Sequence, residues 1–106
     1  MNIQKLDSIE LHDAVIKGWS VDFESGVVRV EVAFFPDSKS AQRVPVCLVF
    51  EEVTSMSDIL DLKKARSSRV SGNVNYWMPN ECGTTYIYLI DGCVAITAKT
   101  VRIETG

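Results

Sequence analysis

The sequence predicts a mainly β domain, either a small antiparallel β-sandwich or a strongly curved sheet. We expect two hairpins, one or two further strands and at most one short helix. Apolar and polar residues alternate over most of the chain, and two short turn sequences, Glu24-Ser25-Gly26 and Asp91-Gly92, each separate two such stretches. With 106 residues, 46% of them hydrophobic, the chain can build one core, so a single domain over residues 1–106 is expected.

The first hairpin is predicted over residues 14–35. Before its turn, apolar side chains occupy odd positions, namely Val15, Trp19, Val21 and Phe23. After the turn they occupy even positions, namely Val28, Val30, Val32 and Phe34. A period of two is typical of half-buried strands, so Trp19 should be buried on the apolar face.

A third strand is expected from about Arg43 to Val53, with Pro45 placing its start at an edge or a bulge. Residues 55–66 fit two interpretations. Ser55 and Asp58 have capping-box spacing and helically spaced residues follow, which favours a short helix, but an extended connection fits as well.

A fourth strand is predicted over residues 70–78. Its alternation places Trp77 with Asn73 and Asn75, on the face opposite Tyr76 and Met78. The run of Tyr76, Trp77 and Met78 has the residue types enriched at protein interfaces, which makes a partly exposed Trp77 a candidate binding anchor. The alternative is that Trp77 belongs to a second core layer.

The second hairpin is predicted from Thr85 to Ile103, around the Asp91-Gly92 turn. Its last strand changes parity, because Val94 and Ile96 are even whereas Val101 and Ile103 are odd. A β-bulge near residues 98–100 would return all four side chains to one face.

Charge and composition exclude several classes of function. Eleven basic and fourteen acidic side chains give a net charge of -3, which disfavours binding to the phosphate backbone of nucleic acids. No apolar run reaches the roughly 20 residues needed to cross a membrane, and the N-terminal residues do not form a signal peptide, so a cytoplasmic protein is expected. Cys47, Cys82 and Cys93 are expected to be reduced thiols, with Cys82 the most accessible. No C-x-x-C pair exists, so zinc is not predicted. No other cofactor is predicted either.

Two groups of polar residues are candidates for a catalytic site or a binding site. His12 and Asp13 suggest a general base, but no nucleophile motif or second histidine accompanies them, so polar turn residues are the simpler interpretation and an enzyme is not favoured. Four cations lie close together: Lys63, Lys64, Arg66 and Arg69. They could bind a phosphate or an acidic protein, although solvated cations at a helix end are the more ordinary explanation.

The motif Leu11-His12-Asp13-Ala14, together with residues 46–50 running into Glu51-Glu52-Val53, resembles a group of small bacterial β-rich proteins. Some of that group are classed as immunity proteins of polymorphic toxin systems. The chain departs from the group after Val53. The resemblance implies a binding protein and brings no catalytic residues.

Three functions therefore remain open. The first is a protein-interaction module, an immunity or antitoxin-like protein among the options, which uses Trp77 with its neighbours or exposed strand edges; such edges also permit a homo-oligomer. The second is a small-ligand-binding β domain with its pocket inside the curved sheet. The third is a minor hydrolase that uses His12 and Asp13.

Overall fold

Six antiparallel strands form one sheet in the computed structural model, which describes residues 9–37, 39–60, 74–90 and 92–105. The strands are β1 (Val15–Asp22), β2 (Val27–Phe34), β3 (Val44–Leu60), β4 (Val74–Met78), β5 (Gly83–Leu89) and β6 (Gly92–Thr105). Their order in the sheet is β1-β2-β3-β6-β5-β4, and the described residues include no helix. The predicted fold class is confirmed, and so are both predicted hairpins, which correspond to β1–β2 and β5–β6.

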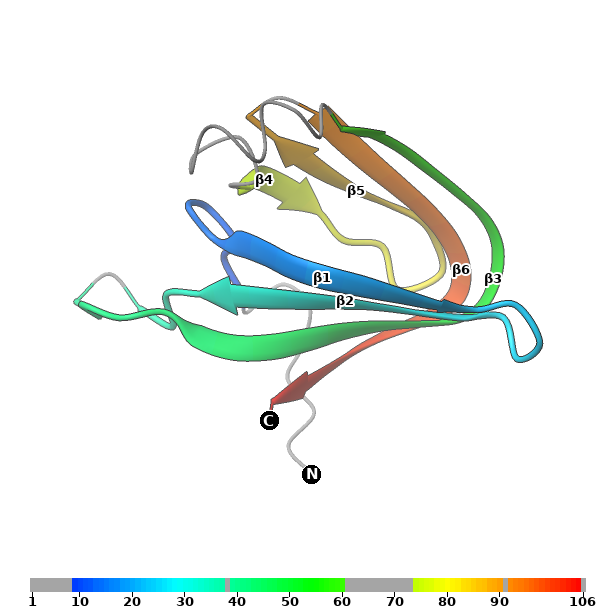
Figure 1. Cartoon of the computed structure of the whole chain (residues 1–106), viewed down its shortest axis with the longest axis horizontal. Helices are drawn as coiled ribbons and strands as arrows, with labels where there is room; N and C mark the ends of the chain where they lie inside the picture. The colour runs from blue at the N-terminus through cyan, green and yellow to red at the C-terminus, as the bar shows by residue number, and fades with distance from the viewer. Residues whose placement is uncertain (1–8, 38, 61–73, 91, 106) are drawn as a thin grey trace.

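The sheet bends back on itself and makes two layers (Figure 1). The long strands β3 and β6 run through both. The first half of β3 pairs with β2 and with the end of β6, whereas its second half pairs with β6 alone. The lower layer therefore contains β1, β2, the start of β3 and the end of β6. The upper layer contains the end of β3, the start of β6, β5 and β4.

The bend is built into both long strands. In β3, Leu48 and Phe50 are buried, Glu52 adopts a left-handed φ of 51°, and the register shifts between Val53 and Ser55. The parity change predicted in β6 has the predicted consequence: Val94, Ile96 and Ile103 are buried, and Val101 packs against the same core. The extra residue lies in the partner strand β3, between Val53 and Ser55, and not at the predicted position in β6.

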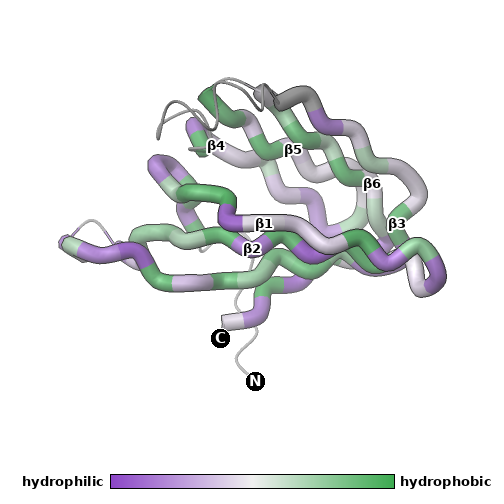
Figure 2. The backbone as a smooth tube through the Cα atoms, in the orientation of Figure 1, coloured by the Kyte–Doolittle hydropathy of each residue, from purple (hydrophilic) through white to green (hydrophobic). Residues whose placement is uncertain are grey.

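The core fills the space between the layers, where apolar segments of the strands face one another (Figure 2). Its largest fully buried side chains are Phe50, Leu11, Leu48, Ile87, Ile96 and Ile103. Burial of each such side chain contributes about 1.5–3 kcal/mol. The concave side of the sheet is thus occupied by the protein's own side chains.

The predicted face of β1 is right after Gly18 and wrong before it. Trp19 and Val21 pair with the buried core residues Val30 and Val28, as predicted. At the start of the strand, Ile16 rather than Val15 packs against the core. The register of β1 against β2 shifts between Ile16 and Gly18, so Ile16 and Trp19 both pack against the core. Trp19 is only half-buried, Val21 is 43% exposed and Phe23 is 93% exposed. A bulge adds one residue to a strand, and that moves every following side chain to the other face.

The prediction that Trp77 is partly exposed is also wrong, for the same physical reason. The register of β4 shifts between Val74 and Tyr76, so Val74 and Trp77, three residues apart, are both buried. Tyr76 and Met78 point outward, and the second core layer is the correct alternative.

The helix considered over residues 55–66 is wrong for its first half, because residues 55–60 continue β3 as a strand. Residues 61–66 lie outside the described residues, as do residues 70–73 of the predicted fourth strand. The cations Lys63, Lys64, Arg66 and Arg69 also lie outside them.

Candidate binding surfaces

The Leu11-His12-Asp13-Ala14 motif forms a turn that joins the two layers. The N–H of Ala14 donates to the carbonyl oxygen of Leu11 at 2.9 Å, and Asp13 adopts a left-handed φ of 64°. Across the gap, the N–H of Asp13 donates to the Val74 carbonyl at 2.9 Å, and the N–H of Val74 donates to the Ala14 carbonyl at 2.7 Å. Leu11 and Ala14 are fully buried. The motif therefore fastens the start of β1 to the start of β4.

His12 strengthens this connection with its exposed ring. Its Nδ1 lies 2.7 Å from the carbonyl oxygen of Asn75, and its Nε2 lies 3.5 Å from the Asp13 carboxylate. The hydrogen bond to Asn75 raises the pKa of His12, and the charge of Asp13 raises that pKa further. Both ring nitrogens face acceptors, and this arrangement favours the charged form of the ring. The geometry thus favours a structural role.

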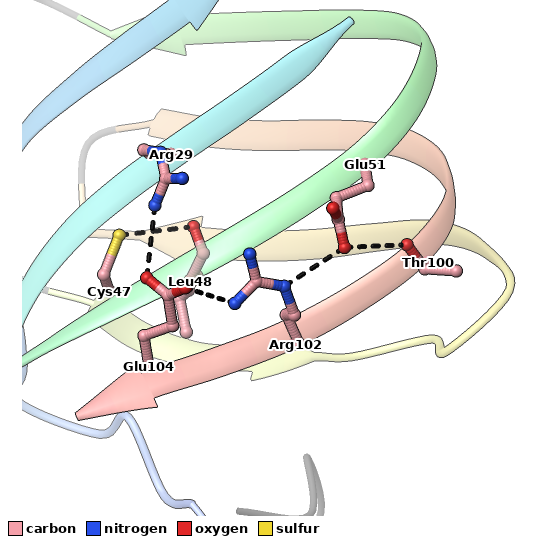
Figure 3. A network of polar contacts seen from close by, with 7 residues as sticks. All are labelled: Arg29, Cys47, Leu48, Glu51, Thr100, Arg102 and Glu104. Atoms are coloured by element: carbon pink, nitrogen blue, oxygen red, sulfur yellow. Dashed lines mark hydrogen bonds and ion pairs between the residues drawn. The ribbon is translucent and has the colours of Figure 1, made fainter. Parts of the chain in front are cut away.

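The outer face of the lower layer is a ladder of charges (Figure 3). Arg29 of β2 contacts Glu104 of β6 at 3.2 Å, and Arg102 bonds to both Glu104 and Glu51. Neighbouring Val49 is fully buried although it does not belong to the core between the layers. Because these paired charges are half-exposed, water still solvates them. The ladder is therefore a face that is stable in contact with solvent.

A groove of about 810 Å³ lies beside the ladder and includes Lys17, Glu31, Arg43 and Cys47. Burial raises the pKa of the Cys47 thiol above its ordinary value, so this cysteine is not an activated nucleophile. Within the described ranges, no group of three or more His, Cys, Asp or Glu side chains could hold a metal ion.

The outer face of the upper layer has the opposite character. Register places eight side chains there in three cross-strand rows: Tyr76, Tyr88 and Cys93; Met78, Tyr86 and Ala95; Thr84 and Thr97. We call these eight residues the tyrosine face. None of them is charged. Tyr76 stacks on Tyr88 with ring centroids 4.6 Å apart, and Tyr86 stacks on Tyr88 at 6.0 Å.

The tyrosine face is exposed at its rim and ordered at its centre. Met78, Tyr76 and Tyr86 are 54%, 46% and 39% exposed, whereas Tyr88 lies half-buried between its two neighbours. The hydroxyls of Thr84 and Thr97 are 2.7 Å apart. The face is therefore a pre-ordered surface that combines aromatic area with hydroxyl groups.

Only part of this surface is predicted by the sequence pattern. Tyr76 and Met78 belong to it as predicted residues, but Trp77, the predicted anchor, points into the core. Tyr86 and Tyr88 were missed. Their equal parity places them on one face of β5, but their stack with Tyr76 also needs the pairing of β5 with β4.

Comparison with known protein families, with curated proteins and with solved structures found no match. Within the described part of the chain, no helix is long and apolar enough to cross a membrane. The fold and surfaces define the class of the protein directly: an all-β domain made from one folded sheet, with a charged outer face and an uncharged tyrosine face.

Proposed function

We propose that this protein is a protein-interaction module whose tyrosine face contacts a protein partner. The observation that carries the proposal is the stack of Tyr76, Tyr88 and Tyr86 on a face without charge. Tyrosine supplies large contact area at a low cost in conformational entropy, and interface centres are enriched in aromatic residues and depleted of charge.

The absence of charge from this face also bears on the partner. A charged partner surface would lose its hydration against the tyrosine face without gaining an ion pair, which is unfavourable. The partner surface that fits best is flat, largely uncharged, and provides hydrogen-bonding groups for the tyrosine and threonine hydroxyls.

The strand edges support contact through a face. In the described part of the sheet, three strands with an unpaired edge carry a register irregularity: β1, β4 and the second half of β3. Bulges at edges disrupt the regular ladder that edge-to-edge pairing needs, so a homo-oligomer through these edges is disfavoured.

An immunity or antitoxin-like role is the finer form of the proposal, and the resemblance carried by residues 11–14 supports it. A cytoplasmic location belongs to the same proposal. It is supported by the three cysteines, all of which are free thiols in this structure.

Site-specific photo-crosslinking tests the proposal in the cells that make the protein. A benzophenone amino acid replaces Tyr76 in one variant and Glu31, on the outer face of the lower layer, in a control variant. We expect a discrete adduct with another protein from the Tyr76 position and not from the Glu31 position. Equal adducts from both positions, or an adduct from Glu31 alone, would contradict the proposal.

A further inference from the structure

A hollow opens between the layers, beside the turn that joins β1 to β2. It has a volume of about 460 Å³. Val28 is buried and Val53 and Met56 pack against the core, while Val21 and Phe23 contribute side chains that are exposed. We call this feature the side hollow. It offers apolar surface to a ligand that approaches from solvent.

Phe23 is the most exposed of the large apolar side chains that the structure describes, at 93%. Its turn is nevertheless well ordered. The Asp22 carboxylate accepts the N–H groups of Glu24 and Ser25, at 3.0 and 3.2 Å, and the N–H of Gly26 donates to the Asp22 carbonyl at 2.9 Å. The turn is also tied to β3, because the N–H of Val53 donates to the Gly26 carbonyl at 2.9 Å.

The ordered turn therefore presents the Phe23 ring to solvent at the margin of the side hollow. Interface anchors are aromatic side chains set beside pockets, and an anchor that is already ordered loses little entropy on binding. Phe23 and the side hollow together have this geometry.

The charged side chains around the side hollow indicate which kind of ligand it favours. Among the residues that the structure describes, Asp22 and Asp58 are the ionisable residues that line the side hollow, both carboxylates, and Glu24 follows Phe23 in the turn. The hydrogen bonds from Ser25 and Glu24 lower the pKa of Asp22, which stays ionised at neutral pH. A second copy of this chain would bring like charges together here, whereas Lys or Arg side chains would be complementary.

We propose that the side hollow binds a cationic polypeptide segment. An apolar side chain of the segment enters the hollow next to Phe23, and flanking Lys or Arg side chains meet Asp58 and Glu24. This inference goes beyond the proposed function, because the side hollow and the tyrosine face share no residue.

The test is a titration of the whole ¹⁵N-labelled chain with a synthetic decapeptide, followed by NMR. The peptide carries a central Leu-Phe pair flanked on each side by two lysines. One comparison peptide has glutamates in place of the lysines, and the other has serines in place of Leu-Phe. We expect saturable shifts at Val21, Phe23, Val53 and Met56 with the first peptide only.

Matched variants separate the contribution of the Phe23 ring to peptide binding from that of the Asp58 charge. Phe23→Ser should raise the Kd of the cationic apolar peptide at least about tenfold, and Asp58→Asn should raise it about threefold. Two controls should change it less than about twofold: Glu31→Gln, which removes the same charge elsewhere, and Tyr86→Ser on the tyrosine face. Because Phe23 is exposed, its replacement should leave the fold intact.

Several results would overturn the inference. They are equal binding of the serine peptide, equal binding of the glutamate peptide, saturable shifts centred on the tyrosine face, and no shift at millimolar peptide. A fifth is a concentration-dependent dimer in sedimentation velocity that Phe23→Ser abolishes, because it would assign the side hollow to a second copy of the chain. Apart from shifts centred on the tyrosine face, none of these results depends on whether that face binds a partner.

Discussion

The indole N–H of Trp77 donates a hydrogen bond to the carbonyl oxygen of Ile9 at 3.0 Å, and both residues are buried. This bond joins β4 in the upper layer to the segment that precedes β1. With the Leu11–Ala14 turn and its bonds to Val74, it closes one side of the folded sheet. The two layers are thus fastened where their edge strands approach each other.

Removal of this bond should destabilise the protein. Trp77→Phe keeps an aromatic ring in the core but leaves the Ile9 carbonyl without its donor, which should cost about 1–3 kcal/mol. Trp77→Ala should cost about 3–5 kcal/mol. Urea denaturation at one pH measures both. Trp19→Phe is the control, and a Trp77→Phe variant as stable as that control would contradict the role given to the hydrogen bond.

The stability of the Leu11–Ala14 turn should depend on pH through His12. The folded-state pKa lies above the ordinary value of 6.5, so the stabilisation is fully present below about pH 6.5 and is lost as the pH rises through the raised pKa. His12 is the only histidine, so it dominates titration in this range. The urea midpoint of the wild type should exceed that of His12→Gln by more at pH 5.5 than at pH 8.5. Parallel pH profiles would refute this.

Two glycines should respond differently to a methyl group. Gly83 has a φ of 143°, and a Cβ there would lie 2.7 Å from Asn80 Nδ2, so Gly83→Ala should destabilise by about 1–3 kcal/mol. At Gly18 the nearest atom would lie 3.9 Å away. Gly18→Ala should therefore change stability by less than about 0.5 kcal/mol. Thermal or urea unfolding of the two variants checks the contrast, and equal losses would contradict the geometry at Gly83.

The three thiols should react in a fixed order. Cys82 is exposed, whereas Cys47 and Cys93 are half-buried, and burial raises the pKa of Cys47. Iodoacetamide should modify Cys82 first, and Cys47 at least about tenfold more slowly. Mass spectrometry of peptides at timed intervals gives the order. Modification of Cys47 as fast as that of Cys82 in the folded protein would contradict it.

Alternation and turn chemistry were enough to predict the fold class and both hairpins. The parity change between Ile96 and Val101 was readable because β6 carries apolar residues on both sides of it. The central strands β2 and β6 have clear patterns because one face of each is buried.

The edge strands could not be read in the same way. The register shifts after Ile16, Val53 and Val74 leave no distinctive residue in the sequence, yet each moves the following side chains to the other face. That is why alternation predicts Trp77 as a surface anchor. Phe23 is exposed for another reason, because β1 ends at Asp22 and Phe23 lies in the turn. The tyrosine face depends on pairing between β4 and β5, which no local pattern specifies.

The affinity of the crosslinked partner, once purified, tests the central claim most directly. Isothermal titration calorimetry would compare the wild type with Tyr86→Ser, on the tyrosine face, and with Glu31→Ser on the opposite outer face. We expect Tyr86→Ser to weaken binding at least about tenfold and Glu31→Ser to weaken it less than about twofold. Glu31→Ser should retain the wild-type unfolding midpoint, because Glu31 is exposed. Tyr86→Ser should lower the midpoint only slightly, through loss of the stack on Tyr88. Unchanged affinity in Tyr86→Ser, or a larger loss in Glu31→Ser, would contradict the assignment of the tyrosine face as the binding surface.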